Sequence, residues 1–407
     1  MPESSEVIVG LEIGTSKICT VIGELTESGA LSVIGLGQAK SRGVRKGEIV
    51  DAPKTVEDIR NAIADAEQMA DAEVRSVYLG VTGSHVRGFS NHGSHRVASD
   101  DREIGESDVQ DVVKNAKAIN LPAENTTIHV VRQLFTVDGQ RGVHEPVGML
   151  GAKLEVDVHV IHGQTTRIQN SVRAVKEVNL EVNEIVFNGL AASLAVLTPQ
   201  QKEMGTVVID LGGGVTEYTV HIDGVVRHSG VIAVGGDHVA NDLAYGLKVP
   251  LGRAEQLKLE YGAAAVDAAC RGQLITLPTE NGLPERQISQ EHLRTIMAAR
   301  LEETLQLIEE DISEAGLMPF LRDGVLLCGG TARVPGITEL AARIFNLPVS
   351  VGRTQGISGL SSALDQPEFV TAIGLVRFGS MLSRRRNREN FLARSFKDTF
   401  TQIFRRA

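Results

Sequence analysis

Three short apolar segments, each closed by glycine, constrain the fold of this chain more than any other feature of its sequence. They read VIVGLEIG over 7–14, VVIDLGGG over 207–214 and VLLCGG over 325–330. Continuous apolar runs of this length, rich in Val and Ile, are typical of strands that are buried within a sheet. We therefore expect three interior strands whose carboxyl ends carry glycine-rich loops.

The first two segments are each followed by a few polar residues and a second apolar run, at 18–22 and 217–222. This spacing predicts two β-hairpins rather than two strand-to-helix turns. The pattern at 7–14 recurs at 207–214 in a chain of 407 residues, a length that suits two or three domains. The recurrence predicts two related halves with a nucleotide-sized cleft between them.

The composition is that of a folded protein in a reducing compartment. Hydrophobic residues make up 42% and charged residues 23% of the chain, which is too apolar for a disordered protein. The net charge of −10 argues against a general nucleic-acid coat. Cys19, Cys270 and Cys328 are far apart in the sequence, which argues against a disulfide framework or a zinc site. No apolar run approaches the ~18 residues of a spanning helix, so we expect any membrane contact to be peripheral.

Periodic apolar patterns predict a series of helices and one inserted segment. The stretch 83–163 combines a charged helix with strands near 127–137 and 152–162, and we interpret it as an insertion into the first half. Residues 379–388 are expected to form a polar linker. The helices are expected at 55–71, 106–118, 165–178, 189–197, 236–246, 253–260, 289–314, 335–345 and 367–379.

The first glycine loop, Gly14-Thr15-Ser16-Lys17, joins two predicted strands. Its small residues let backbone N–H groups approach phosphate oxygens, and Lys17 adds a positive charge. Taken alone, this loop fits an ordinary hairpin turn equally well. The second loop is more specific, because three consecutive glycines at the end of a buried strand pack poorly and lose much entropy on folding. Asp210 beside them can hold Mg²⁺ through water.

Two further glycine pairs extend the pattern. Gly329-Gly330-Thr331-Ala332-Arg333 closes the third strand and precedes a predicted helix, and Gly235-Gly236-Asp237 opens another helix. This arrangement is neither a P-loop nor the dinucleotide-binding GxGxxG pattern. Together, the two hairpin loops and the later strand–GG–helix turn predict nucleotide binding.

Five segments together resemble the nucleotide-binding signature of the actin/Hsp70/hexokinase superfamily. Residues 11–17 and 207–220 are similar to its two phosphate loops, and 326–337 are similar to its adenosine motif. Residues 184–197 and 367–379 are similar to its two connecting helices. The resemblance implies an α/β actin-like fold of two lobes, with ATP and Mg²⁺ as cofactors.

The same resemblance implies roles for individual residues. Asp210 and Glu12 would face Mg²⁺ and are the candidates for any catalytic role, although the superfamily usually has Asp at the position of Glu12. Glu255 and Lys258 would hold the ribose and adenine. The other candidates for binding the cofactor are Gly14, Thr15, Ser16, Lys17, Gly212, Gly213, Gly214, Gly235, Gly236, Gly329, Gly330, Thr331 and Arg333.

Within the superfamily the chain resembles the FtsA family of bacterial cell-division actins. Four segments are similar to the domain, called 1C, that this family carries in place of subdomain 1B of actin: 81–86, 128–130, 135–140 and 146–156. At Val215-Thr216-Glu217 the family often has Thr and Asp instead. The resemblance implies subdomain 1A over 1–82, 165–202 and 361–379, 1C over 83–164, 2A over 203–236 and 313–360, 2B over 237–312, a basic linker over 380–389 and an amphipathic helix over 390–407.

The segment 390–407 is predicted to be an amphipathic helix independently of any family. Its apolar face on a helical wheel comprises Leu392, Phe396, Phe400, Ile403 and Phe404. Outside this face lie the basic residues Arg394, Lys397, Arg405 and Arg406. Such a helix is too short and too charged to cross a bilayer, but it suits the surface of anionic lipid. A helix docked on the body and, less readily, a nucleic-acid arm are the alternatives.

The family resemblance implies an ATP-binding, polymerising protein, at most a weak ATPase, that anchors FtsZ filaments at the division site. It would lie peripherally on the cytoplasmic face of the inner membrane, without nucleic acid, and help to recruit later division proteins. The C-terminal peptide of FtsZ would dock on 2B, where the candidate contacts are Arg294, Arg300, Glu302 and Glu303. A pilus-assembly actin-like protein similar to PilM and a small-molecule kinase of the same superfamily are the alternative functions.

Overall fold

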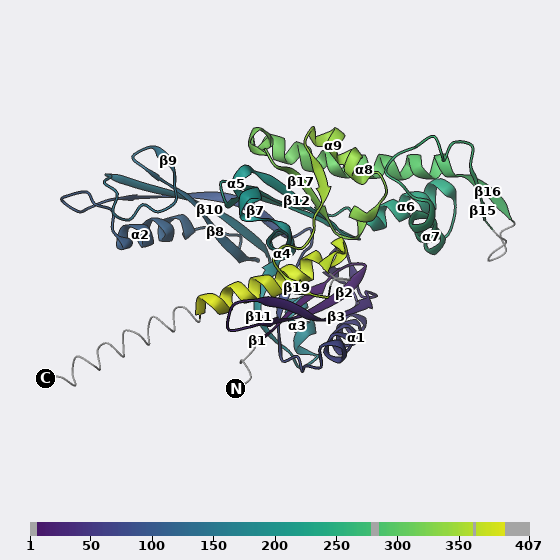
Figure 1. The fold of residues 1–407 in the computed structure, drawn as a ribbon, viewed down its shortest axis with the longest axis horizontal. Coiled ribbons are helices and arrows are strands. Elements are labelled where there is room, and N and C mark those ends of the chain that lie inside the picture. The colour runs from purple at the N-terminus through teal and green to yellow at the C-terminus, as the bar shows by residue number, and fades with distance from the viewer. Residues whose placement is uncertain (1–5, 278–284, 361–363, 387–407) are drawn as a thin grey trace.

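The computed structural model describes residues 6–277, 285–360 and 364–386. Two lobes, each built on a central sheet, make up the body of the molecule (Figure 1). A domain with its own sheet projects from one side of this body, and a mainly helical domain projects from the opposite side (Figure 1). The yellow helix in the figure, over 370–386, lies between the lobes.

The two central sheets repeat one topology, which confirms the two related halves predicted from the recurring hairpin. Each has three antiparallel strands followed by two parallel ones, in the orders β3-β2-β1-β6-β11 and β14-β13-β12-β17-β18. The first lobe has β1 (Glu6–Ile13), β2 (Lys17–Leu25), β3 (Leu31–Lys40), β6 (Ser76–Val81), β11 (Glu181–Phe187) and the edge strand β19 (Ser358–Gly359). The second has β12 (Thr206–Leu211), β13 (Thr216–Ile222), β14 (Val225–Ile232), β17 (Gly324–Cys328) and β18 (Val349–Val351).

The three glycine-closed segments are interior strands, as predicted. Every residue of β12 and of β17 is buried, and β1 is buried along most of its length. Strands covered on both faces require a continuous apolar run rather than an alternating one. The strands β1 and β2, and likewise β12 and β13, form the two predicted antiparallel hairpins.

The helices follow the predicted order with small shifts at their ends. They are α1 (Ala52–Ala70), α2 (Glu106–Lys117), α3 (Thr165–Lys176), α4 (Asn188–Val196), α5 (Pro199–Met204), α6 (Gly236–Leu247), α7 (Leu251–Tyr261), α8 (Gln290–Glu314), α9 (Ile337–Phe345) and the helix over 370–386. Single 3-10 turns occur at Met318–Phe320, Gly330–Arg333 and Pro367–Phe369. No helix within the described ranges is long and apolar enough to cross a bilayer.

One local element was missed, and one helix end was predicted wrongly. The short helix α5 was not predicted, although Thr198 caps it by accepting a hydrogen bond from the backbone N–H of Gln201. The last helix was expected to end at 379, with a linker beyond it, but it continues to residue 386. Ser380 and Ser383 are buried against the body. Packing against the first lobe therefore continues the helix through residues that the sequence pattern assigned to a linker.

The chain between β6 and α3 forms a separate antiparallel sheet in the order β7-β10-β8-β9, which we call the inserted domain. Its strands are β7 (Arg87–Arg96), β8 (Asn125–Val137), β9 (Gln140–Val143) and β10 (Lys153–Gln164). Helix α2 packs on one face of this sheet, where Val112 and Ala116 share a core with Phe135. The inserted domain therefore has a hydrophobic core of its own.

Two small strand pairs and three helices complete the described part of the fold. The hairpin of β4 (Val44–Arg45) and β5 (Glu48–Ile49) follows β3 in the first lobe. The projecting domain of the second lobe contains α6, α7 and α8 with the hairpin of β15 (Leu274–Leu277) and β16 (Arg286–Ser289). Ser289 accepts a 3.2 Å hydrogen bond from the backbone N–H of His292 and so caps the N-terminus of α8.

Close contact between two helices holds the junction of the lobes together. Gly374, on the last helix, allows this contact, because a Cβ there would lie 1.9 Å from the carbonyl oxygen of Ala191 on α4. On the strand side, a Cβ on Gly10 of β1 would lie 2.5 Å from the carbonyl oxygen of Ala372. Real Cβ atoms do not approach this closely, so both positions require glycine.

We expect Gly374→Ala to destabilise the protein, because the added methyl group must push the last helix away from α4. Overpacking of a tight interior usually costs about 1–3 kcal/mol, which exceeds the ~1 kcal/mol that Ala gains over Gly in a helix. The free energy of unfolding in urea, followed by circular dichroism, measures this loss.

Gly252→Ala in α7 is the matched control, because a Cβ there would meet no described atom within 4 Å. This variant should be neutral or slightly stabilised. Unchanged stability of Gly374→Ala would contradict the packing at this junction.

Candidate functional site

A cavity of about 610 Å³ opens where the two hairpin loops face each other. Both lobes and the start of α6 contribute to its walls. Of the residues predicted to bind a cofactor or metal, Gly235 alone is absent from the lining. The others that line it are Glu12, Gly14, Thr15, Ser16, Lys17, Asp210, Gly212, Gly213, Gly214, Gly236, Glu255, Lys258, Gly329, Gly330, Thr331 and Arg333. The structure thus brings residues from five separate stretches of the chain into one cleft: 12–17, 210–214, 236, 255–258 and 329–333.

The two hairpin loops share one backbone geometry. The N–H of Gly14 donates to the carbonyl of Lys17 at 3.0 Å, and the N–H of Gly212 donates to the carbonyl of Val215 at 3.1 Å. A Cβ on either glycine would lie 2.7 Å from the carbonyl oxygen that it contacts. Both turns therefore need glycine, and each leaves backbone N–H groups at the carboxyl end of a buried strand, where they can bind an anion.

The loops are in contact across the cleft, which explains the run of three glycines. A Cβ on Gly213 would lie 2.9 Å from the Cβ of Ser16, and one on Gly214 would lie 2.5 Å from Oγ1 of Thr15. Side chains on the second loop would force the two loops apart. Glycine here serves close approach of backbone to a neighbour rather than an unusual backbone angle.

Glu12 and Asp210 occupy equivalent positions, two residues before the first glycine of each loop. Burial raises the pKa of the Glu12 carboxyl from 4.5 to about 7, while Lys17 lowers it and the charge of Asp210 raises it further. Burial also raises the pKa of Asp210, against the opposing effects of a hydrogen bond from Thr371 and the charge of Lys17. Among the described residues, Oε2 of Glu12 has no hydrogen-bond partner. A bound cation would supply the missing partner for this carboxylate.

A third carboxylate, Glu217, was not predicted as a site residue. It lies opposite Asp210 in the register of β12 and β13 and also lines the cavity. Burial raises its pKa well above the ordinary value, and the charges of Asp210 and Glu12 raise it further. Its Oε1 is buried without a partner among the described residues. The register of the predicted hairpin would have revealed Glu217, because directly paired residues point to the same face of a sheet.

Glu368, in the turn before the last helix, also lines the cleft, and sequence reasoning assigned this turn no ligand contact. The ammonium group of Lys17 donates a 2.6 Å hydrogen bond to the carbonyl of Glu368. The carboxylate of Glu368 pairs with Arg333 at 2.6 Å, and Thr371 donates to Asp210. Lys17, predicted to face phosphate, is therefore held by this turn. Asp210, predicted to face the metal, is held by the start of the last helix.

The predicted ribose and adenine residues, Glu255 and Lys258, lie on α7, and Lys258 reaches the start of α6. Lys258 pairs with Glu255 at 2.6 Å and donates to the carbonyl of Gly236 at 3.0 Å. The second hairpin loop is bonded to the same helix start, because the N–H of Gly236 donates to the carbonyl of Gly212 at 3.0 Å. Gly235, which lies behind this contact, supports the loop: a Cβ there would lie 2.6 Å from the carbonyl oxygen of Gly212.

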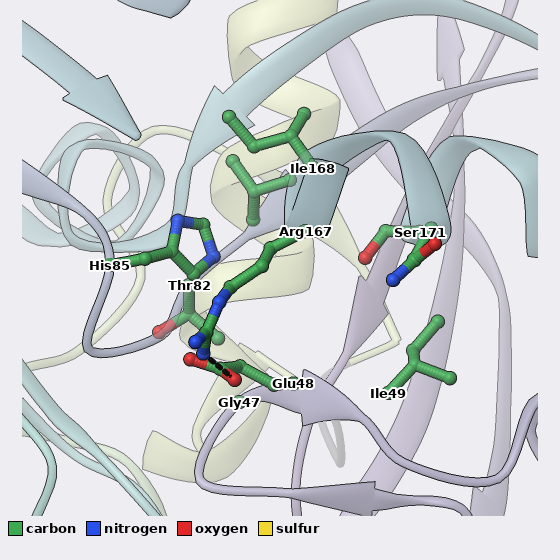
Figure 2. Close-up of a pocket in the computed structure, with 10 residues that line it drawn as sticks. Gly47, Glu48, Ile49, Thr82, His85, Arg167, Ile168 and Ser171 are labelled. Atoms are coloured by element: carbon green, nitrogen blue, oxygen red, sulfur yellow. Dashed lines mark hydrogen bonds and ion pairs between the residues drawn. The ribbon is translucent and has the colours of Figure 1, made fainter. Parts of the chain in front are cut away.

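A second, smaller cavity of about 180 Å³ adjoins the cleft (Figure 2). Thr82 lines both cavities. In the figure, the side chain of Arg167 extends from α3 to Glu48, with which it forms an ion pair. His85 lies beside Arg167. The smaller cavity therefore lies where the inserted domain joins the first lobe.

The residues predicted to bind a partner peptide on α8 have partners within the chain. Arg300 forms a bidentate ion pair with Asp242 of α6 and also pairs with Glu303. Arg294 pairs with Asp267 at 2.8 Å and donates to a backbone carbonyl of α7. These arginines join helices of the projecting domain to one another. The residues predicted to contact membrane, within 390–407, lie outside the described residues.

The cleft has the chemistry of a site for a magnesium-bound nucleoside polyphosphate. Backbone N–H groups of two loops and the ammonium of Lys17 suit phosphate oxygens, and Asp210 and Glu12 suit a hydrated cation. In the part of the chain that the structure describes, no three His, Cys, Asp or Glu side chains converge to coordinate a metal directly. Magnesium is commonly bound by one or two carboxylates, water and the phosphates of its ligand, so Asp210 and Glu12 fit it in that mode.

We expect Glu12→Gln to stabilise the protein at high pH but not at low pH. A carboxyl whose pKa rises from 4.5 to about 7 on folding costs stability as pH rises, because the unfolded chain ionises first. The cost begins near pH 4.5 and levels off above pH 7, reaching up to about 3 kcal/mol at 1.36 kcal/mol per pH unit. Urea unfolding of both proteins at pH 5 and pH 8 measures it.

The matched control is Glu73→Gln, at an exposed position, which should show no such pH-dependent difference from the wild type. Because the charge of Glu12 raises the pKa of Glu217, the difference between wild type and Glu12→Gln also includes the relief of Glu217, which has the same sign. A difference between wild type and Glu12→Gln that does not grow from pH 5 to pH 8 would contradict the burial of an uncompensated carboxyl here.

Two family models match the chain. One, for cell division protein FtsA, matches residues 207–374, and the other, for the SHS2 domain inserted in FtsA, matches residues 83–162. Among solved structures, the PilM–PilN type IV pilus biogenesis complex is similar with a TM-score of 0.65, 14% identity and coverage of 92% of this chain and 98% of that chain. MreB5 of Spiroplasma citri bound to ADP is similar with a TM-score of 0.58, 14% identity and coverage of 94% and 98%. At such identities these structures show the actin-like fold alone.

Curated relatives match over nearly the whole chain. Cell division protein FtsA of Pseudomonas aeruginosa is 37% identical over 377 residues, covering 93% of this chain and 90% of that protein. FtsA of Escherichia coli K12 is 34% identical over 381 residues, covering 92% and 90%. The chain therefore belongs to the FtsA family of cell division proteins and has an actin-like fold of two lobes with the inserted domain of that family.

Proposed function

We propose that this chain is an ATP- and Mg²⁺-binding, polymerising scaffold that anchors FtsZ filaments to the cytoplasmic face of the inner membrane. It would act at the division site and help to recruit later division proteins. The observation that carries the proposal is the cleft, in which two glycine hairpins meet over buried carboxylates within a chain of the FtsA family. The proposed partners are FtsZ, further copies of the chain, anionic lipids and other division proteins, but not nucleic acid.

The residues of the cleft support a nucleotide-dependent scaffold with at most weak ATPase activity. Lys17, Glu12 and Asp210 would hold the phosphates and the hydrated cation, and Glu255 and Lys258 would hold the nucleoside. When bound, Mg²⁺ would neutralise charge on the phosphates. We assign no general base, and Glu12 and Asp210 remain the candidates for a catalytic role.

The alternative functions have weaker support. The PilM-containing structure is similar in fold, but its 14% identity carries no functional argument. The relatives that are 34% and 37% identical are cell division proteins. A kinase would require a base placed beside the terminal phosphate and a second substrate, and we assign neither.

Membrane attachment is proposed for the segment 390–407 on the basis of its sequence. Each basic residue near an anionic surface contributes about 1 kcal/mol, and the apolar face adds several more from partial burial. The cost of folding the helix offsets part of this gain, so a single copy would bind reversibly. A filament that displays many copies would bind far more strongly without new contacts.

We expect Phe400→Glu to release the protein from anionic vesicles, because it places a charge on the apolar face of the proposed helix. Co-sedimentation with phosphatidylglycerol-containing vesicles, combined with negative-stain microscopy, measures binding and filament formation with and without Mg·ATP. A shortened chain that ends at residue 386 should also stay in solution, and it preserves the described part of the last helix.

Gln402→Glu is the matched control, because it adds the same charge on the opposite side of the helical wheel. This variant should still bind vesicles, with at most a modest loss. If Phe400→Glu co-sediments with vesicles as well as the wild type does, the segment 390–407 is not the membrane anchor. Filaments that form equally well on neutral vesicles would contradict the role of anionic lipid.

Partner binding is proposed for α8 and its surroundings, where Arg294, Arg300 and Glu303 would contact the C-terminal peptide of FtsZ. We expect Arg300→Glu to weaken peptide binding by about tenfold, the value of one charge-assisted hydrogen bond of ~1.5 kcal/mol. Fluorescence anisotropy with a labelled peptide measures this loss.

The ion pair between Arg300 and Asp242 supplies the control. Asp242→Asn breaks the same pair but leaves the positive charge of Arg300 available to a peptide. It should bind the peptide at least as well as the wild type does. Equal loss of binding in Asp242→Asn and Arg300→Glu would show that the ion pair, rather than the arginine, matters, and would contradict a direct contact.

A further inference from the structure

The hairpin of β4 and β5 touches the first phosphate loop from outside the cleft. The backbone N–H of Gly47, at its tip, donates a 2.9 Å hydrogen bond to Oγ1 of Thr15. Gly47 has a φ of 76°, and a Cβ there would lie 2.8 Å from Cγ2 of Thr82. The tip therefore fits between the phosphate loop and Thr82, and only glycine fits without strain.

The next residue, Glu48, is bonded to the segment by which the chain enters the inserted domain and to the segment by which it leaves. We call these two segments the crossings. Its carboxylate accepts a 3.2 Å hydrogen bond from Ser84, just before β7. It also forms an ion pair with Arg167, just after β10 (Figure 2). The chain enters the inserted domain past Ser84 and leaves it before Arg167. One side chain is thus bonded to both segments that connect this domain to the first lobe.

The two crossings are also bonded to each other. The backbone N–H of Gln164 donates to Nδ1 of His85 at 3.2 Å. The cavity of about 180 Å³ lies at the same place and is lined by Glu48, His85 and Arg167. Its volume gives these side chains room to rearrange, which a close-packed interior would not allow.

The inserted domain is held on its other side by the second lobe. Nε2 of His159 and Oγ of Ser229 lie 2.7 Å apart, both on buried residues. Gln133 of β8 donates to the carbonyl of Val226 at 3.0 Å. The domain is therefore attached to the first lobe at its root and to β14 of the second lobe along its sheet. If one lobe moves relative to the other, the contacts of the inserted domain with at least one lobe must change.

We propose that Glu48 is a positioning residue that couples filling of the cleft to the orientation of the inserted domain. This inference rests on the proposed nucleotide binding. The hydroxyl of Thr15 can accept from Gly47 and donate to a phosphate oxygen at the same time. A bound phosphate fixes the hydroxyl and strengthens the bond to Gly47, because hydrogen bonds in a chain polarise one another. When the hairpin is fixed against the phosphate loop in this way, which we call the seated hairpin, Glu48 stays bonded to Ser84 and Arg167. Both crossings are then fixed as well.

The coupling has a thermodynamic requirement that this geometry meets. A ligand shifts an equilibrium only when it interacts differently with the two states. Phosphate bound at Thr15 favours the seated hairpin, and the seated hairpin favours the bonds of Glu48 to Ser84 and Arg167. Coupling is reciprocal, so anything that fixes the orientation of the inserted domain will also change the affinity for the nucleotide.

Amide hydrogen exchange of the full chain, with and without Mg·ATP, tests the proposal. In the wild type, Mg·ATP should slow exchange in β7 and β10 by about threefold or more, a change well within the range of local opening equilibria. Glu48→Gln and Arg167→Met break the same ion pair from opposite sides. Both should lose most of this slowing while their affinity for Mg·ATP stays within about threefold of the wild type.

Lys153→Met is the matched control, because it breaks an exposed ion pair with Glu155 in the same domain without touching its root. This variant should keep the full effect of Mg·ATP. Wild-type slowing in both Glu48→Gln and Arg167→Met would overturn the proposal. So would a wild type that binds Mg·ATP by calorimetry but shows no change in β7 and β10. A wild type that does not bind Mg·ATP would overturn the proposed function as well.

Discussion

The structure depends on the contact between two hairpin loops across the cleft. Gly213 and Gly214 face Thr15 and Ser16 with no room for a Cβ. The loops come from two halves that repeat one topology, so the same local geometry supplies backbone N–H groups from both sides. Because the second loop lacks side chains, the lobes can approach closely enough for the two sets of N–H groups to face one ligand. The location of the cleft therefore follows from the pairing of a glycine-rich loop with a loop of small residues.

The buried carboxyls of the cleft lower the stability of the folded protein. Glu12, Asp210 and Glu217 are buried carboxyls with raised pKa values, and burial of a charge without a full set of partners costs stability. Lys17 and Thr371 offset part of this cost for Asp210. Such a cluster has no evident structural benefit, and a bound cation would relieve it. The conflict between stability and charge is typical of functional sites.

Much of this arrangement could be predicted from the sequence, because it is encoded locally. The glycine-closed apolar runs identify both hairpins, and the recurrence of the pattern identifies the two halves. Contacts between distant segments could not be predicted. Lys17 reaches the carbonyl of Glu368, and neither residue carries a local signal of the other. The last helix continues past 379 because Ser380 and Ser383 pack on the first lobe, and Arg300, which looks available in sequence, is paired with Asp242.

Every role proposed for the cleft requires a bound magnesium nucleotide, so calorimetric titration of the full chain with Mg·ATP is the decisive measurement. We expect binding with a dissociation constant well below ~1 mM, the weak end of the usual range of enzyme KM values. We also expect loss of that binding in Asp210→Ala and on removal of Mg²⁺. Wild-type affinity in Asp210→Ala, or no binding by the wild type at millimolar ATP, would show that the cleft is not a magnesium-nucleotide site.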